Sequence, residues 1–366
     1  MKYGRVSPAV TDRSIIRPLA SCLSGTDAYG QTGISSGAVG GFLDRRPEMI
    51  LAEAVNSLHN GGADVPADPA EIHLTMSAAL APDTPEETLK QLMQRCGAWI
   101  RNNGFGSGDA AAYVSDAVRR PVLTVCAQAQ AGDRGQKIQP QDRKLQDIQL
   151  QDIQPQDRKL QNRKLQNRKP PDIKQYGLYM AGYAGLAGTA ILAEDLAEEL
   201  SRCFPGVWLE RAKSFDRYLL ISGEGDVGRK MPPETDRSLL PGPAQNVAEG
   251  GILAALWHFS GRLKCGIDVD LRRIPIRQET IEICERLTIH PYQLYTCGAV
   301  LLAADAEDEE RLRKLRESYD ERDIPFARIG SLTERKAGIL RSGDEIRYLE
   351  KPQQDALAVL AQRHEF

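Results

Sequence analysis

Residues 249–257 read EGGILAALW, and they are followed by GIDVD at 266–270 and IPIRQE at 274–279. The glycine pair predicts the start of an apolar helix through Leu253, Leu256 and Trp257. The short run at 266–269 predicts a strand, and residues 276–287 predict a helix with one polar face. This part of the chain therefore alternates short strands with helices.

The same alternation continues outward in both directions. Residues 218–221, 298–304, 326–329 and 346–349 predict strands, and a charged run at 305–323 with Leu312, Leu315 and Tyr319 predicts the solvated face of one helix. Further upstream we expect a helix at 49–58 and a strand at 121–127. Thr84-Pro85-Glu86-Glu87 predicts another helix start, with Thr84 as N-cap and Pro85 in the first turn. These elements indicate an α+β fold.

An internal repeat divides the chain. Residues 138–146 and 153–161 both read IQPQDRKLQ, and residues 133–174 hold eleven Lys or Arg against six Asp. Such a sequence buries too little apolar surface to fold by itself. We therefore predict an N-terminal domain at 1–131, a disordered linker at 132–174 and a C-terminal domain at 175–366. The linker is either a solvated tether or a basic arm that weakly contacts an acidic partner or RNA.

Composition narrows the possible functions. The 366 residues carry a net charge of -3, so binding of nucleic acid through bulk charge is not expected outside the linker. No apolar run reaches the length of a membrane-spanning helix, and the seven cysteines form no CxxC pair or His/Cys ligand cluster. We expect reduced thiols and a cytoplasmic protein without a membrane segment.

The order of several motifs resembles one family. EGGILAALW, GIDVD and IPIRQE are followed by GAVLLAA at 298–304 and IPFARIG at 324–330, and preceded by GLAGTAILA at 185–193. Together they resemble the C-terminal domain of AIR synthase-related proteins, closest to the HypE hydrogenase-maturation branch. The resemblance implies a PurM-like architecture, in which an N-terminal β-sheet domain forms a dimeric barrel and the C-terminal domain is an α/β sandwich. It also implies a homodimer, a possible protein partner, and ATP with Mg²⁺ as ligands.

The resemblance extends to short motifs of a nucleotide site. AVNSL at 54–58 is similar to the family's VND motif, GTDA at 25–28 to GxDxA, GSGD at 106–109 to GGDT, and QNVAEGG at 245–251 to HDxTxGG. Carried over, these motifs imply nucleotide binding by Asp27, Asn56, Asp109, Asn246, Glu249, Gly250 and Gly251, with Asp27 and Asp109 as metal ligands. Simpler roles exist for the same residues: turn formation for the two Asp, a helix-dipole contact for Glu249, and close packing for the glycines.

Three acids of the family pattern are replaced by uncharged residues. Gly37 stands in the place of the acid of the S/T-T-D motif, Ser57 in that of VND, and Asn246 in that of HDxTxGG. Mg²⁺ on a polyphosphate needs carboxylate ligands, so efficient phosphoryl transfer by the usual route is not expected. The sequence also lacks the terminal cysteine on which HypE-type enzymes carry their substrate. Two hypotheses remain: a divergent ATP-dependent enzyme acting on an amide or carbonyl, or a non-catalytic dimeric scaffold or ligand-binding pseudoenzyme.

Overall fold

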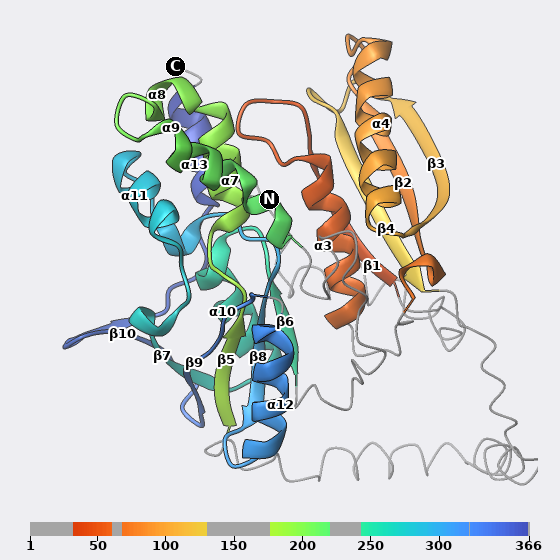
Figure 1. Cartoon of the computed structure of the whole chain (residues 1–366). Helices are drawn as coiled ribbons and strands as arrows, with labels where there is room; N and C mark the ends of the chain where they lie inside the picture. The colour runs from red at the N-terminus through yellow and green to blue at the C-terminus, as the bar shows by residue number, and fades with distance from the viewer. Residues whose placement is uncertain (1–31, 61–67, 130–175, 220–242, 322, 365–366) are drawn as a thin grey trace, which may run out of the picture.

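The computed structural model describes residues 32–60, 68–129, 176–219, 243–321 and 323–364. They form two parts, one built on a four-stranded sheet and the other on a seven-stranded sheet (Figure 1). The predicted α+β class is confirmed. Asp27 and the predicted linker at 132–174 lie outside the described residues.

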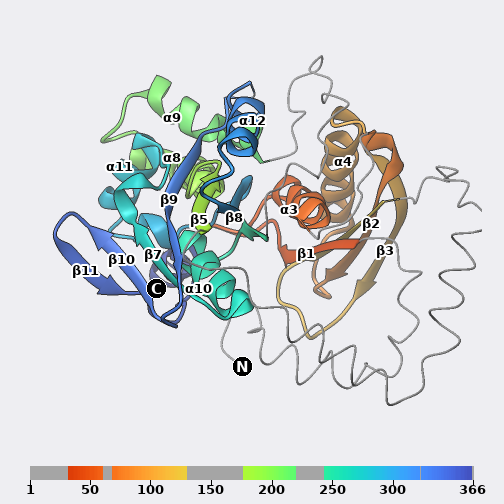
Figure 2. The same ribbon diagram turned by 90° about the horizontal axis from the view of Figure 1, so that it is seen from below.

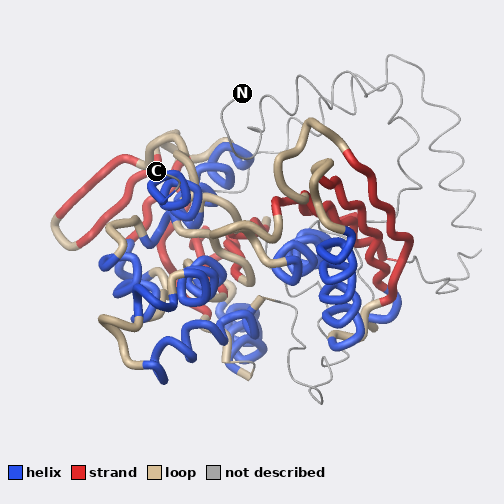
Figure 3. The backbone as a smooth tube through the Cα atoms, turned by 90° about the horizontal axis from the view of Figure 1, so that it is seen from above, coloured by secondary structure: helices blue, strands red, loops and turns tan. Residues whose placement is uncertain are grey.

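The first part has the strand order β1-β4-β2-β3. Its strands are β1 (Thr32–Ala38), β2 (Ile72–Leu80), β3 (Gly106–Val114) and β4 (Val122–Ala129); its helices are α3 (Pro47–Asn60), the 3₁₀ turn η3 (Pro69–Glu71) and α4 (Glu86–Asn102). β2 and β3 are parallel, and the other pairs are antiparallel. Figure 3 shows α3 and α4 on the same face of this sheet.

Helix α4 is confirmed, but its predicted cap is wrong. The helix begins at Glu86 with Pro85 at the N-cap position, and no side chain caps it. The backbone N–H of Thr84 instead closes a turn with the carbonyl of Ala81, at 3.0 Å. The helix is held by the apolar face that carries Leu92 and Cys96, both buried against the sheet.

Among the described residues, helices pack on only one face of the four-stranded sheet. Leu123, Val125 and Ala127 point toward the helices and are fully buried. On the opposite face, Ile34 is 61% exposed and Tyr113 is 57% exposed. Both edge strands of the sheet, β1 and β3, therefore carry an exposed apolar side chain on this face.

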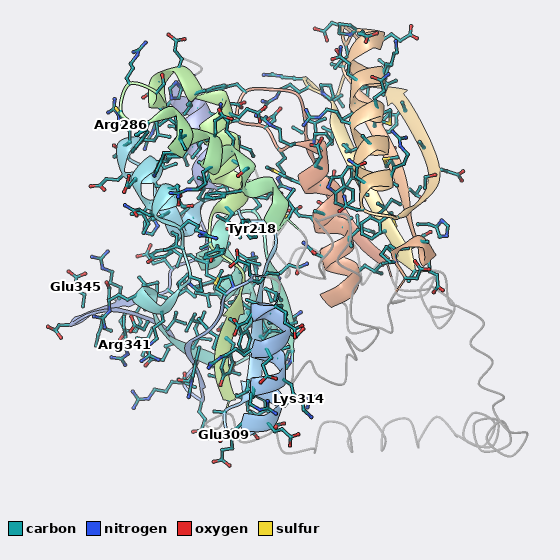
Figure 4. The ribbon with its side chains drawn as sticks, viewed as in Figure 1. Tyr218, Arg286, Glu309, Lys314, Arg341 and Glu345 are labelled. Atoms are coloured by element: carbon teal, nitrogen blue, oxygen red, sulfur yellow. The ribbon has the colours of Figure 1, made fainter. Side chains whose placement is uncertain are left out.

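The second part has the strand order β11-β10-β7-β9-β5-β8-β6. Its strands are β5 (Tyr176–Ala181), β6 (Ala244–Val247), β7 (Gly266–Asp270), β8 (Ala299–Asp305), β9 (Phe326–Thr333), β10 (Gly338–Ser342) and β11 (Glu345–Tyr348). Neighbouring strands are antiparallel except for β7 and β10. Figure 4 shows Arg341 and Glu345 on the hairpin that projects from one edge.

Helices cover both faces of the seven-stranded sheet. Along β5, Leu178 and Met180 pack with α10 (Gly251–Leu263), whereas Tyr179 and Ala181 pack with α12 (Glu309–Asp320). Successive side chains of a strand point to opposite faces, so α10 and α12 lie on opposite sides. This arrangement is the α/β sandwich expected from the sequence.

A layer of helices joins the two parts. It consists of α7 (Leu186–Asp195), α8 (Ala197–Leu200), α9 (Gly206–Lys213), α11 (Gln278–Arg286) and α13 (Ala356–His364), with the 3₁₀ turns η5 (Ser214–Tyr218), η7 (Leu271–Arg273) and η8 (Pro291–Gln293) nearby. Met49 and Ala52 of α3 belong to the same apolar cluster as α7 and α13. Figure 2 shows α3 and β1 on the side of the first part that faces the second.

Two further outcomes concern single elements. The strand predicted at 218–221 is wrong at its start, because Tyr218 ends the 3₁₀ turn η5, and residues 220–221 are not described. Across the residues that the structure places, no helix is long and apolar enough to span a bilayer.

Candidate functional site

Arg45 lies at the centre of the junction between the two parts. It follows β1 in the loop that leads to α3, and its Nη1 is 3.2 Å from Oε2 of Glu53 on α3. Its Nη2 is 2.8 Å from Oε2 of Glu249, which immediately precedes the α10 region. The guanidinium carbon also lies 4.7 Å from the centre of the Tyr295 ring. The Arg45 side chain therefore pairs with one acid from each of the two parts.

These charges are largely withdrawn from water. The side chains of Arg45 and Glu53 are 16% and 12% exposed, and that of Glu249 is 33% exposed. Burial by itself disfavours the cation, but the surrounding acidic groups, Glu53 first, together outweigh it and raise the pKa of Arg45. Ser35 donates a further hydrogen bond to Glu53 Oε2, at 2.6 Å. Arg45 is therefore a permanent, internally neutralised charge.

Tyr295 and Cys297 line the buried side of this network. Burial first, and Glu53 second, raise the pKa of both side chains well above their usual values. The Tyr295 hydroxyl and Glu53 Oε1 are buried, and neither makes a hydrogen bond of regular geometry within the described part of the chain. The Cys297 sulfur faces the carbonyl of Leu219 at 3.6 Å. Cys297 is therefore a neutral thiol and a poor nucleophile.

The positions where the sequence lacks acids meet at this junction. Gly37 in β1 lies against Arg45, since a Cβ atom on this glycine would be 3.2 Å from Arg45 Cδ. Asn246 in β6 donates from Nδ2 to Ser57 Oγ at 3.3 Å, across the two parts. Neutral contacts and an arginine therefore stand where the resemblance expects metal-binding carboxylates.

Asn56 has a role in joining the parts. It is 3% exposed, and its Nδ2 donates to the carbonyl oxygen of Leu219 at 2.7 Å. Figure 4 shows the neighbouring Tyr218 in the middle of the molecule, at the side of the second part that faces α3. At least one donor of the predicted nucleotide-binding Asn56 is thus used within the protein.

The glycine pair at the start of α10 is required by packing. Gly250 and Gly251 have φ of +79° and +64°, in the left-handed region. A Cβ atom on Gly251 would come within 2.5 Å of the carbonyl oxygen of Tyr292. The N–H of Gly251 donates to the Ala248 carbonyl at 3.0 Å. The structure therefore supports the packing role considered from the sequence.

Asp355 is a site residue that the sequence motifs did not reveal. Its Oδ2 accepts from the N–H of Gly250 at 2.7 Å, and its Oδ1 accepts from the N–H of Leu357 at 2.9 Å. It is 4% exposed, and burial raises its pKa to about 7; Glu249 adds to the rise, while the two hydrogen bonds and Arg45 oppose it. An Asp before the apolar run that becomes α13 is an N-cap signal, which locates the residue but not its contact with α10.

The predicted residues are only partly brought together. Asn56, Asn246, Glu249, Gly250 and Gly251 lie around the junction. Asp109, in contrast, is exposed in β3, at the sheet edge opposite β1, and the turn predicted at 106–109 is part of that strand.

The described residues do not fit a Mg²⁺ site at the junction. Within the described ranges there is no group of three or more His, Cys, Asp or Glu placed to hold a metal ion. Glu53 and Glu249 are already paired with Arg45. A cation at Arg45 would also repel a divalent ion bound to the same carboxylates.

A cavity lies on the helical layer, beside the contacts that Asp195 makes with Leu43 and Arg46 of the first part. Its volume is about 400 Å³, and it is lined by Asp195, Leu196, Glu198, Glu199, Arg202 and Arg286. Figure 4 shows Arg286 on the outer side of the helical layer. None of the site residues predicted from the sequence lines this cavity.

The chain is thus a two-domain α+β protein, in which a four-stranded sheet domain contacts an α/β sandwich through polar side chains. Residues 244–342 match the family of AIR synthase related proteins, C-terminal domain. These residues are therefore similar to that family, and the chain has the PurM-like two-domain fold. No curated protein sequence matches the chain.

Solved structures share the fold at low sequence identity. HypE from E. coli has a TM-score of 0.54 and 16% identity, covering 98% of this chain and 93% of that chain. A HypE structure in complex with ATP has a TM-score of 0.54 and 14% identity, covering 97% of each chain. Thiamine-monophosphate kinase from Stenotrophomonas maltophilia has a TM-score of 0.51 and 18% identity, covering 87% of each chain. At these identities the likeness shows the fold alone.

Proposed function

We propose that this chain is a homodimeric AIR synthase-related protein whose interdomain site has lost Mg²⁺–ATP chemistry and serves in ligand binding or as a scaffold. The observation that carries the proposal is the pairing of Arg45 with both Glu53 and Glu249, beside Gly37. Because Glu53 and Glu249 are paired with Arg45, they are not available as the metal ligands that phosphoryl transfer would need.

The charge at the junction also opposes polyphosphate. Three acids act electrostatically on the single cation of Arg45: Glu53, Glu249 and Asp355. When the three are ionised, the acids outnumber the cation. An incoming triphosphate would therefore meet negative charge at low dielectric, where repulsion is strong.

The alternative function is ATP-dependent catalysis on an amide or carbonyl. It is favoured by the fold shared with a HypE structure in complex with ATP. In that case, acids such as Asp109, which is exposed on β3, would have to act from another place than the junction.

The open sheet face supports the homodimer. Ile34 and Tyr113 present apolar area on a four-stranded sheet whose other face is covered by α3 and α4. Two such faces packed together would remove this area from water.

A second protein partner is also proposed, since one structure of the same fold is a HypE–HypF complex. A cytoplasmic location fits the free thiols of the six described cysteines.

Calorimetry with nucleotides tests the proposal. We expect no heat of binding when ATP or ADP is titrated into the full chain at millimolar concentration, with or without Mg²⁺, and no release of phosphate. Mg²⁺-dependent binding accompanied by phosphate release would instead establish the enzyme. A HypE protein run under the same conditions controls for the sensitivity of both assays.

A further inference from the structure

Strand β11 forms one edge of the seven-stranded sheet. It is the last strand in the sheet order, and among the residues that the structure describes it pairs only with β10. Figure 2 shows the β10–β11 hairpin on the side of the second part that lies away from the first. Ile346 and Tyr348 of this strand are 58% and 73% exposed. An edge strand with large exposed apolar side chains is a template for pairing with another strand.

The outward hydrogen-bonding groups of β11 are those of Ile346 and Tyr348. The N–H of Leu349 donates to the carbonyl of Gly338 at 2.8 Å, which continues the antiparallel ladder between β10 and β11. Hydrogen-bonded and non-hydrogen-bonded pairs alternate along such a ladder. The main-chain groups of Arg347 therefore point toward β10, whereas those of Ile346 and Tyr348 point away from it. A further strand would bind at these two positions.

The charges of β11 decide which strand fits. Successive side chains of a strand point to opposite faces, so Glu345 and Arg347 share one face while Ile346 and Tyr348 share the other. A second copy of β11 can pair antiparallel through the outward groups, with Ile346 opposite Ile346. Glu345 of each copy then lies opposite Arg347 of the other, which is favourable. The neighbouring registers would place Arg347 opposite Arg347, or Glu345 opposite Glu345, and both are repulsive.

We infer that β11 is a self-complementary edge that pairs with β11 of a second copy, around a two-fold axis at Ile346. The pairing continues the sheet from one copy into the next and covers Ile346 and Tyr348 of both. The strand has four residues, so the contact is weak, with a Kd on the order of 0.1–1 mM. It is separate from the proposed homodimer, which uses the sheet of the first part. Where both contacts form, dimers join into tetramers or longer assemblies.

Exchange of the charges tests the inference. In sedimentation of the full chain, the average mass should rise between about 10 µM and about 1 mM. Glu345→Arg and Arg347→Glu should each abolish this rise, because each leaves only like charges facing one another across the two strands. An equimolar mixture of the two variants should restore the rise, since one copy then carries only cations at these positions and the other only anions.

The exchanged variants should remain folded. Glu345 and Arg347 pair within their own strand at 2.8 Å, but their side chains are 66% and 74% exposed, and such pairs add little stability. Tm should therefore stay within about 2 °C of the native value. The matched control is Arg313→Glu, which makes the same change of charge at an exposed ion pair of α12 and should leave the rise in mass unchanged.

A main-chain variant provides a second measurement. Ile346→Pro removes the outward N–H, which β10 does not use, and proline is tolerated at such an edge position. This variant should also lose the rise in mass.

Two results would overturn the inference. One is a mass of the native chain that does not change over the concentration range, and the other is a mixture of the two exchanged variants that associates no more than either alone. Tyr113→Glu separates this contact from the proposed homodimer, because Tyr113 lies on the first part. That variant should be monomeric when dilute and should still associate when concentrated. A dilute native chain that is already monomeric would count against the homodimer only.

Discussion

Arg45 links the two parts of the molecule by pairing with an acid of each. It lies against Gly37, where an acid is expected from the family pattern, and binds acids from both parts of the molecule. A buried cation with two carboxylate partners adds little net stability compared with an apolar core. Its removal is nevertheless costly, because the two carboxylates are then buried without a compensating charge. Arg45 therefore matters most for holding the junction in one arrangement.

Substitution of Arg45 should be costly. Arg45→Met leaves Glu53 and Glu249 without their cation, and we expect the free energy of unfolding to fall by about 3–5 kcal/mol in urea denaturation. Arg95→Met is the matched control, because Arg95 pairs with Glu48 at 2.9 Å but is 53% exposed. That change should cost less than about 1 kcal/mol. Equal losses in the two variants would show that the Arg45 network is no more important than a surface pair.

Asp355 should give stability a distinct pH dependence. Its folded pKa of about 7 lies above the usual value of 3.8 for the unfolded chain. Between these values the folded protein holds the extra proton, so the contribution of Asp355 to stability falls as pH rises from about 4 to about 7. The total change is on the order of a few kcal/mol.

Asp355→Asn should remove this contribution. The difference in free energy of unfolding between Asp355→Asn and the native chain should grow in favour of the variant as pH rises through that interval, measured by urea denaturation at several pH values. Parallel pH profiles for the two proteins would contradict the elevated pKa.

At the scale of single elements, the start of α10 depends on its glycines. Gly251→Ala would force a side chain into the left-handed region and toward the Tyr292 carbonyl. We expect a loss of about 2 kcal/mol or more in thermal or urea unfolding. Gly261→Ala, in the same helix, meets no atom within 4 Å and should stabilise by about 0.5–1 kcal/mol. A tolerated Gly251→Ala would mean that the helix start can shift.

At the scale of the whole molecule, several polar contacts fix the two parts together. Leu43 donates its N–H to Asp195 Oδ2 at 2.7 Å, and Arg46 pairs with the same carboxylate and with Glu194. With Arg45–Glu249 and Asn56–Leu219, these contacts surround the apolar patch of α3. A junction built in this way favours one fixed arrangement over an open cleft.

The homodimer is tested on the open sheet face. Tyr113→Glu places a charge among exposed apolar side chains of the first part, and we expect light scattering after size exclusion to show a monomer where the native chain shows a dimer. Val207→Glu is the control, since Val207 is 87% exposed on α9, on the other part of the molecule. A native chain that is already monomeric would remove the dimer from the proposal.

Local patterns in the sequence were sufficient for much of the fold. The apolar spacing of α10, the charged face of α12 and the apolar run of β8 predicted these elements, because periodicity reports which face of an element is buried. Strands β1, β2, β3, β5, β6 and β10 were not predicted. For β3 the reason is that GSGDAAA is rich in small and polar residues and forms an exposed edge strand without alternation. The family resemblance came from the order of motifs, which is also a property of the sequence.

Only the tertiary structure decided what the junction is made of. Arg45 and Glu249 are 204 residues apart, and Gly250 and Asp355 are 105 residues apart. No local periodicity encodes such pairs, because they form only when two sheets and a helical layer bring distant segments together. The motif order in the sequence predicts uncharged residues, Gly37, Ser57 and Asn246, at positions where the resemblance expects acids. The folded chain places Arg45 against Gly37 and Asp355 against Gly250, because a buried charge is stable only beside a partner and these partners meet only when the chain folds.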